Sequence, residues 1–203
     1  MGRLKLISVS LVEIMAMKNI LFASCLSLFC AIASAAELSG VFVDDEIKAS
    51  SGETLVLNGI GLREKFWVDV YVGALYLPDK SSDVAEILSR PGPWRVQLDF
   101  VYKEVDQKKL IKAWREGFEK NQSDETLQKL QPRIDQFYQY FDSGVVAKEQ
   151  YAFDYIPQQG VRISRNQKEL GVIPGEDFKN ALLEIWLGNH PADKKLKKGM
   201  LGL

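Results

Sequence analysis

An uncharged run of 17 residues, 20–36, determines how much of this chain has to fold and whether disulfides can stabilise the folded part. It begins shortly after Lys18 and ends in the small residues Ala33-Ser34-Ala35-Ala36. A basic start, an apolar stretch and small residues at the exit are the three parts of a secretory signal peptide. The sequence therefore predicts a periplasmic or secreted protein, with cleavage near Ala35 or Ala36.

A membrane anchor is the alternative interpretation of the same run. Seventeen residues is the short limit for a helical span, and no cluster of Lys or Arg follows to stop transfer. We therefore favour cleavage. Residues 1–16 are then upstream sequence, because Glu13 is unusual in the leading region of a signal peptide. Residues 37–203 form the single predicted domain.

Cleavage leaves a domain without cysteine, since Cys25 and Cys30 are the only two in the chain. Disulfide, thiol and Cys-metal chemistry are then excluded from the working protein. A domain of this size buries about 70% of its unfolded surface, so a hydrophobic core can support it. The formal net charge is −1, from 26 basic and 27 acidic residues. This balance indicates no nucleic-acid partner.

Strand patterns begin and end the predicted domain, and the longest covers residues 66–77. There Phe66 and Val70 share one face, while Trp67 and Tyr71 share the other. Shorter strands are predicted at 54–57, before a turn at Asn58-Gly59, and at 94–102, 151–156, 161–164 and 168–173.

Helix patterns, with apolar residues three and four apart, fill the rest of the domain. They predict helices over 106–121, over 123–141 with a kink at Pro132, over 176–187 ending at Gly188, and over a lysine-rich 193–201. The sum is one α+β domain, in which helices cover one face of an antiparallel sheet.

Few residues offer metal or nucleophilic chemistry. His190 is the only histidine, so neither a metal site nor a His-dependent triad is indicated, and we predict no metal and no cofactor. Gly59-Ile60-Gly61 lacks the third glycine of a dinucleotide fingerprint, and we interpret it as a turn. The lysines of residues 194–198 are expected to form a solvated face, with weak contact to anionic lipid headgroups as the open alternative.

The segment 57–66 is the best candidate for a functional site. It places Arg63 and Lys65 beside the most apolar strand. An arginine held there by a glycine-rich turn could bind a carboxylate or an oxyanion through two parallel hydrogen bonds of its guanidinium. An exposed arginine paired with a neighbouring acid is the alternative that base rates favour.

Four segments in this order resemble the chalcone isomerase-like family, and most closely its bacterial exported branch. They are Gly59-x-Gly61-x-Arg63-x-Lys65-Phe66, residues 70–77, Ala113-Trp114 through Asn121, and Phe178-x5-Glu184-Ile185-Trp186-Leu187-Gly188-x2-Pro191. The similarity covers roughly residues 40–202. It implies the chalcone isomerase fold, an open-faced β-sandwich whose large antiparallel sheet is covered by helices around an apolar cleft.

The resemblance also implies which residues line the cleft. In the true isomerases of the family an Arg, a Thr, a Tyr and an Asn act together. Arg63 matches the Arg, whereas Tyr71, Gln107 and Trp114 stand where the Thr, Tyr and Asn would be. With Gln107 and Trp114 at the Tyr and Asn positions, the predicted helix lacks the hydrogen-bond donors that would hold a ketone and its water. The remaining Arg63 and Tyr71 suit an apolar molecule that ends in a carboxylic acid. Plant fatty-acid-binding relatives of the family are described as binding such a ligand through an Arg and a Tyr.

These residues imply an exported, non-catalytic binding protein for a small apolar or amphipathic carboxylate, with Arg63, Tyr71, Gln107 and Trp114 as ligand-binding residues and none as catalytic. A chalcone isomerase-type lyase is the first alternative. An envelope structural or interaction protein with a filled cleft is the second. Trp67, Tyr76 and Trp186 are expected in the core, where aromatic side chains usually pack.

Overall fold

The computed structural model describes residues 35–203, so the predicted signal peptide before Ala35 lies outside the described residues. The elements are β1 (Ala35–Leu38), β2 (Val41–Asp44), β3 (Glu46–Lys48), β4 (Thr54–Lys65), β5 (Val68–Leu77), α2 (Val84–Ser89), β6 (Trp94–Phe100), β7 (Glu104–Val105), α3 (Gln107–Asn121), α4 (Asp124–Gln139), β8 (Val145–Val146), β9 (Gln150–Ile156), β10 (Gly160–Arg165), β11 (Lys168–Ile173), α5 (Glu176–Leu187) and α6 (Lys194–Met200).

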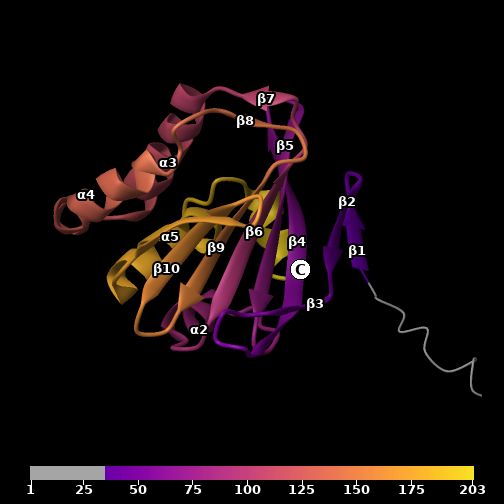
Figure 1. Cartoon of the computed structure of the whole chain (residues 1–203), viewed down its shortest axis with the longest axis horizontal. Helices are drawn as coiled ribbons and strands as arrows, with labels where there is room; N and C mark the ends of the chain where they lie inside the picture. Colours follow the sequence, from indigo (N-terminus) through magenta and orange to yellow (C-terminus); the bar gives the residue numbers. More distant parts are fainter. Residues whose placement is uncertain (1–34) are drawn as a thin grey trace, which may run out of the picture. The chain divides into compact units, whose positions relative to one another are not determined.

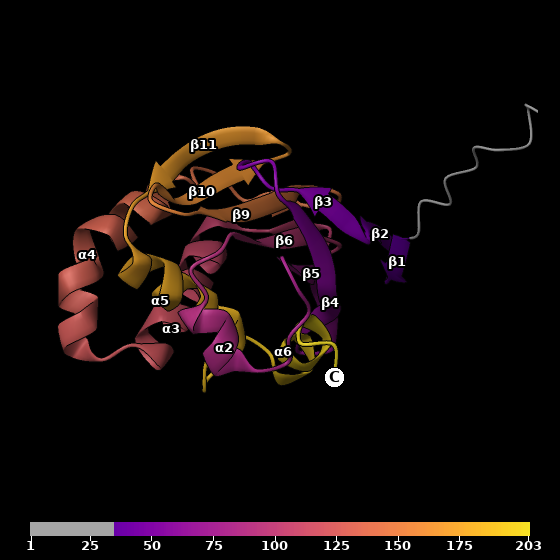
Figure 2. The ribbon, with the colours of Figure 1, turned by 90° about the horizontal axis from the view of Figure 1, so that it is seen from below.

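One curved sheet organises the described residues (Figure 1). It has seven strands in the order β11-β10-β9-β6-β5-β4-β3, and every neighbouring pair is antiparallel. Figure 2 shows α2, α5 and α6 on the concave side of this sheet. The predicted α+β architecture, with helices covering one face of a large antiparallel sheet, is confirmed.

An aromatic cluster forms the centre of the core between sheet and helices. The Trp114 ring of α3 lies 5.3 Å from the ring centroids of Phe137 and Phe141. It also lies 5.6 Å from Phe153 of β9 and 5.7 Å from Trp186 of α5. Because these rings come from the sheet, two helices and the segment after α4, the cluster fixes α3 against the sheet.

The turn predicted at Asn58-Gly59 is wrong, because β4 runs through it. Leu57 pairs with Tyr76 and Gly59 pairs with Leu75, so Asn58 is an extra residue that bulges from the ladder. The buried Asn58 amide donates to the Met200 carbonyl at 2.8 Å. The bulge changes which face the following residues occupy, since alternation along a strand restarts after one extra residue.

The glycines of β4 serve helix packing, so the predicted glycine turn is wrong as well. A Cβ on Gly59 would stand 2.1 Å from the Gly199 carbonyl oxygen, and one on Gly61 would stand 2.6 Å from that of Leu196. A Cβ on Gly199 would in turn meet the Ile60 carbonyl oxygen at 2.2 Å. Helix α6 therefore packs backbone to backbone on β4, which any larger residue would prevent.

The two aromatic residues expected to begin the long strand form a turn instead. Lys65 pairs with Val68, so Phe66 and Trp67 are the two central residues of the β4–β5 hairpin. Their φ angles are 50° and 66°, in the left-handed region that costs about 1–2 kcal/mol per residue outside glycine. Trp67 is 98% exposed, so its predicted place in the core is wrong.

The other predictions of elements and core residues largely hold. The strands at 94–102, 151–156, 161–164 and 168–173 and all four predicted helices are present, and Tyr76 and Trp186 are buried. Helix α4 continues through Pro132. Strands β1, β2, β3, β7 and β8 and helix α2 were not predicted. No helix among residues 35–203 is long and apolar enough to cross a membrane.

An ion pair joins α4 to the start of α5. It should make the free energy of unfolding depend on pH. Arg133 donates to both Asp177 oxygens at 2.6 and 2.9 Å, and these bonds hold the pKa of Asp177 well below its usual range. A carboxylate with a lowered folded-state pKa stabilises the fold fully above its unfolded value near 3.9 and loses that effect as the pH falls further. Since Asp177 is partly exposed, we expect Asp177→Asn to cost about 1 kcal/mol at neutral pH.

Urea unfolding at neutral pH and near pH 2 measures this effect. The difference between Asp177→Asn and the wild type should shrink toward acid. A matched variant, Asp135→Asn, removes a carboxylate from an exposed part of α4 that accepts only from Gln131. It should change little at either pH. A penalty for Asp177→Asn that stays constant with pH would contradict the assignment.

Candidate functional site

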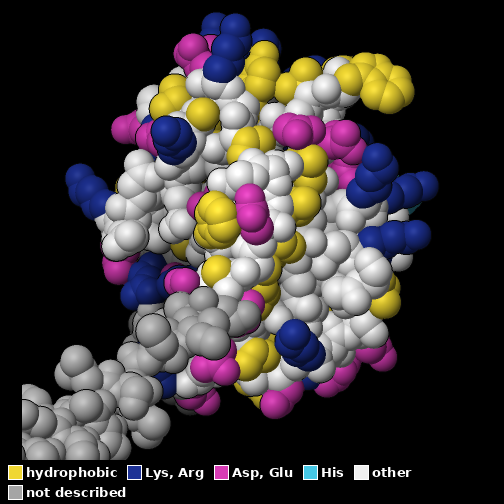
Figure 3. Space-filling model, turned by 90° about the vertical axis from the view of Figure 1, so that its right-hand side faces the viewer, with side chains coloured by type: hydrophobic (Ala, Val, Ile, Leu, Met, Phe, Trp, Pro, Cys, Tyr) yellow, Lys and Arg dark blue, Asp and Glu magenta, His cyan; other side chains and the backbone are white. Residues whose placement is uncertain are grey.

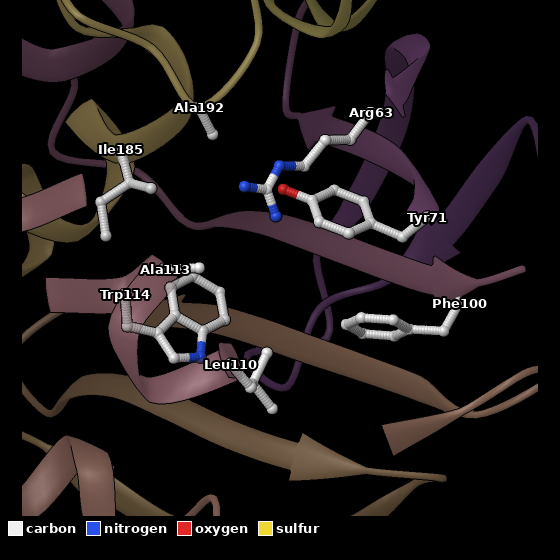
Figure 4. A pocket seen from close by; sticks show the side chains of 8 residues that line it. All are labelled: Arg63, Tyr71, Phe100, Leu110, Ala113, Trp114, Ile185 and Ala192. Atoms are coloured by element: carbon white, nitrogen blue, oxygen red, sulfur yellow. The ribbon is translucent and has the colours of Figure 1, made fainter. Parts of the chain in front are cut away.

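Arg63 and Tyr71 lie directly opposite each other on β4 and β5. Cross-strand partners share one face of a sheet, and the bulge at Asn58 turns this face of β4 toward the helices. The guanidinium carbon of Arg63 lies 5.5 Å from the Tyr71 ring centroid. Figure 4 shows the guanidinium and the Tyr71 hydroxyl side by side, pointing into the space that Ala192 and Ile185 border.

A second bulge beside this pair shapes the site. Arg63 pairs with Tyr71 but Glu64 pairs with Asp69, which leaves Val70 as the extra residue of β5. The Val70 carbonyl accepts from the backbone N–H groups of residues 101 and 102, after β6. Bulges re-aim neighbouring side chains, and these two flank the stretch of β4 that carries Arg63.

Hydrogen-bond donors gather at this point without matching acceptors. The Nε of Arg63 and the Nε1 of Trp114 are buried and have no hydrogen-bond partner among the described residues. Glu64, the acid next to Arg63 on β4, pairs with Lys195 at 2.9 Å. Buried donors are normally satisfied, so unpaired ones at a cavity favour a ligand or water that accepts hydrogen bonds.

The Tyr71 hydroxyl adds a neutral donor to the group. It accepts from Trp186 Nε1 at 3.1 Å, which leaves its own proton for another acceptor. Burial raises the pKa of Tyr71, while the charge of Arg63 and the hydrogen bond from Trp186 oppose that rise. The phenol therefore keeps its proton at physiological pH.

Two neighbouring spaces share the Arg63 side chain as part of their lining. The inner cavity has a volume of about 20 Å³, close to the space of one water molecule. The outer cleft has a volume of about 420 Å³, within the usual range for small-molecule sites. Both are lined by Arg63, Phe100, Leu110 and Ala113. Arg63 therefore stands where the inner cavity meets the outer cleft.

The outer cleft combines an apolar lining with basic residues. Its apolar lining includes Val68, Val70, Phe100, Val105 and Leu110. Its charged lining residues are Arg63, Lys65, Lys109, Lys112 and the single acid Glu104. An apolar wall with an excess of positive charge suits a ligand with an apolar body and an anionic end.

The structure brings three of the four predicted site residues together. Arg63, Tyr71 and Trp114 line the inner cavity. Gln107 does not, because it is exposed at the first position of α3 and its Nε2 donates to the Phe141 carbonyl at 2.8 Å. Lys109 and Lys112, which flank the buried Leu110 on α3, were not predicted as site residues. Their position on both sides of an apolar residue of that helix is the sequence feature that could have indicated their place in the cleft.

Metal ligation finds no support in the part of the chain that the structure describes. Residues 35–203 contain no group of three His, Cys, Asp or Glu side chains that could hold an ion. His190 is exposed in the loop after α5, where its backbone N–H donates to the Asn121 Oδ1 at 3.0 Å.

Comparisons with known proteins identify the family. A search of curated proteins found no match. The structure is similar to that of a fatty-acid binding protein of Arabidopsis thaliana, with a TM-score of 0.67 and 14% sequence identity over 83% of this chain and 96% of that one. At this identity the likeness concerns the fold. The sequence profile of the chalcone isomerase-like family matches residues 35–202, and the chain therefore belongs to the chalcone isomerase-like family.

Proposed function

We propose that this protein is a non-catalytic binding protein for a small amphipathic carboxylate of the fatty-acid type. The observation that carries the proposal is the Arg63 guanidinium, which stands at the junction of an apolar cleft and a cavity with its Nε unpartnered. A carboxylate there would accept hydrogen bonds from Arg63 and Tyr71 and would meet no acid among the residues that line the inner cavity.

The ligand's tail would supply more of the affinity than its headgroup. A hydrogen bond to a charged group contributes about 1.5–3 kcal/mol net, whereas each buried CH₂ contributes about 0.8 kcal/mol. Six or so buried methylene groups therefore outweigh the headgroup. Because the inner cavity holds about 20 Å³, the tail has to lie in the outer cleft, with the carboxylate reaching Arg63 from that side.

The size of the outer cleft also separates this proposal from a protein with a filled cleft. The inner cavity taken alone would favour the filled-cleft alternative, since it leaves room for little more than water. The outer cleft of about 420 Å³ favours binding. The Arabidopsis protein of the same fold is a fatty-acid binding protein, which adds support for a ligand of this class.

We also propose export, on the predicted signal peptide. The predicted cleavage positions, Ala35 and Ala36, fall within the first two residues of β1. Mass spectrometry of the protein isolated from a periplasmic extract should give a mature chain that begins at residue 36 or 37. Recovery of the uncleaved chain from membranes would favour the anchor instead.

Ligand titration tests the binding proposal. We expect dodecanoate to bind at least about tenfold more tightly than 1-dodecanol at pH 7.5, because only the acid forms charged hydrogen bonds with Arg63. The preference should fade as the pH falls through the range near 4–5 in which a carboxylate is protonated. Displacement of a fluorescent fatty acid measures both affinities.

Two outcomes would contradict the proposal. Equal affinity for the acid and the alcohol at pH 7.5 would remove the role of Arg63 as an anion anchor. Steady conversion of a 2′-hydroxychalcone to its flavanone, lost in Arg63→Ala, would establish the isomerase alternative. We expect flat progress curves with that substrate.

A further inference from the structure

The tip of the β4–β5 hairpin exposes two large aromatic side chains. Phe66 is 85% exposed and Trp67 is 98% exposed, both with left-handed φ angles. Two-residue hairpin loops that need this backbone favour Asn-Gly, because a side chain is disfavoured there. Neither burial nor turn geometry accounts for these two residues, so their presence at the tip calls for a partner outside the fold.

Basic residues outnumber acidic ones in the lining of the cleft beside this tip, while the exposed Asp69, two positions after Trp67, opposes them. Phe66 lines the outer cleft together with Lys65, Lys109 and Lys112, and Glu104 is the one acid in the same lining. Lys112 lies 3.9 Å from Glu116, a distant and exposed pair. In the space-filling view of Figure 3, hydrophobic and basic side chains lie at the upper end with acidic ones beside them, where Figure 1 places β7 and the start of β5.

We propose that this hairpin tip, residues 65–68, docks on the surface of an anionic lipid bilayer. Trp67 and Phe66 enter the headgroup boundary, where aromatic rings are favoured, and the lysines contact lipid phosphates. The basic excess of the cleft lining beside the tip is complementary to such a surface. Basic residues around apolar side chains are the usual composition of peripheral membrane anchors.

The geometry favours a bilayer over a protein partner. Two adjacent side chains at the end of a narrow hairpin offer far less area than the roughly 800 Å² per partner that a stable protein interface buries. A lipid surface needs no complementary shape, so a protruding tip is enough to engage it. The docked protein would turn the mouth of the outer cleft toward the membrane. This inference does not depend on the ligand proposed above.

Tryptophan fluorescence with lipid vesicles tests the docking. Trp94, Trp114 and Trp186 are at most 5% exposed, so a spectral change on mixing with vesicles reports Trp67. We expect a blue shift with phosphatidylcholine vesicles containing about one third phosphatidylglycerol, and a much weaker shift with phosphatidylcholine alone. Co-sedimentation with the same vesicles measures the partition coefficient.

The double variant Phe66→Asn/Trp67→Gly removes the aromatic pair and installs the residues that this turn prefers. It should therefore fold at least as well as the wild type, while its partition into the anionic vesicles falls at least about tenfold. Lys109→Gln/Lys112→Gln should lower that partition by about fivefold per lysine, with little effect on neutral vesicles.

Two matched controls locate the effect. Phe42→Ser removes another exposed aromatic side chain, 67% exposed on β2, and should leave partition unchanged. Lys194→Gln/Lys198→Gln removes two exposed lysines of α6 and tests the weaker lipid contact expected from the sequence. It should have little effect.

Three results would overturn the proposal. The first is an absence of wild-type binding to anionic vesicles. The second is binding that survives Phe66→Asn/Trp67→Gly. The third is self-association in solution that this variant abolishes while vesicle binding is unchanged, which would assign the tip to a second copy of the chain.

Discussion

Replacing Arg63 with glutamine is expected to lower the affinity for dodecanoate about 10- to 100-fold, which corresponds to the 1.5–3 kcal/mol of a charged hydrogen-bond pair. Its affinity for 1-dodecanol should change little, because the alcohol does not use the charge. Titration of both ligands against both proteins measures this, and the ratio between them isolates the contribution of the guanidinium.

Two further variants make the Arg63 result specific. Arg115 also lies over a tyrosine ring, 6.0 Å from Tyr138, but it lines neither the inner cavity nor the outer cleft. Arg115→Gln should therefore leave dodecanoate binding unchanged. Tyr71→Phe removes the second donor and should reduce the affinity by about 3- to 10-fold, the value of a neutral hydrogen bond. Equal losses in Arg63→Gln and Arg115→Gln would indicate a nonspecific charge effect.

The stability of the unliganded protein separates a binding role of Arg63 from a structural one. The buried Nε of Arg63 has no partner among the described residues, so this atom contributes no hydrogen bond to the stability of the fold. Unpaired buried donors are unfavourable and are retained at sites where a ligand completes them. We therefore expect Arg63→Gln to unfold at the same urea concentration as the wild type or a higher one. A clear loss of stability would argue for a structural role.

Replacing Gly61 with alanine is expected to destabilise the protein by about 3 kcal/mol, the upper part of the range for overpacked cores. The added Cβ would stand 2.6 Å from the Leu196 carbonyl oxygen and 2.8 Å from its Cα. Both are backbone atoms of α6, so no side chain can move aside. The helix has to shift away from β4, and the contacts of its fully buried Leu196 and Met200 weaken.

Urea unfolding measures the cost at Gly61, and limited proteolysis shows where it falls. Cleavage near α6 should be faster in Gly61→Ala than in the wild type. Gly92→Ala is the matched control, since a Cβ there meets only the Pro78 Cγ at an ordinary 3.6 Å. It should change stability by less than about 0.5 kcal/mol. Similar losses in both variants would show that the packing of α6 on β4 is not the cause.

Elements with a strong local pattern could be predicted from the sequence. Examples are the apolar stripes of α3, α4 and α5 and the turn residues between β9 and β10. Each of these patterns is formed by residues close together in the chain, so a short stretch of sequence is enough to identify the element. Arg63, Tyr71 and Trp114 were placed in one site through the family resemblance. Gln107 was assigned to that site by the same comparison, but its amide bonds the Phe141 carbonyl instead.

The errors around β4 share one physical cause. Asn-Gly and Gly-x-Gly are favoured in turns, and the sequence analysis assigned them to turns. Here Asn58 forms a bulge held by Met200, and Gly59 and Gly61 admit the backbone of α6. These partners lie about 140 positions away in the chain, so no local window contains the interaction that decides the conformation.

The sequence by itself determined the class of the domain, four of the five helices of residues 35–203, most of the central strands, and the family through the segments that include Arg63. Only the tertiary structure decided which way Arg63 faces, because one extra residue at Asn58 reverses the alternation of β4. It also decided that Phe66 and Trp67 are exposed at a turn, where the alternating pattern had predicted a strand. Local periodicity fixes the type of an element, whereas the register between strands fixes which side chains meet.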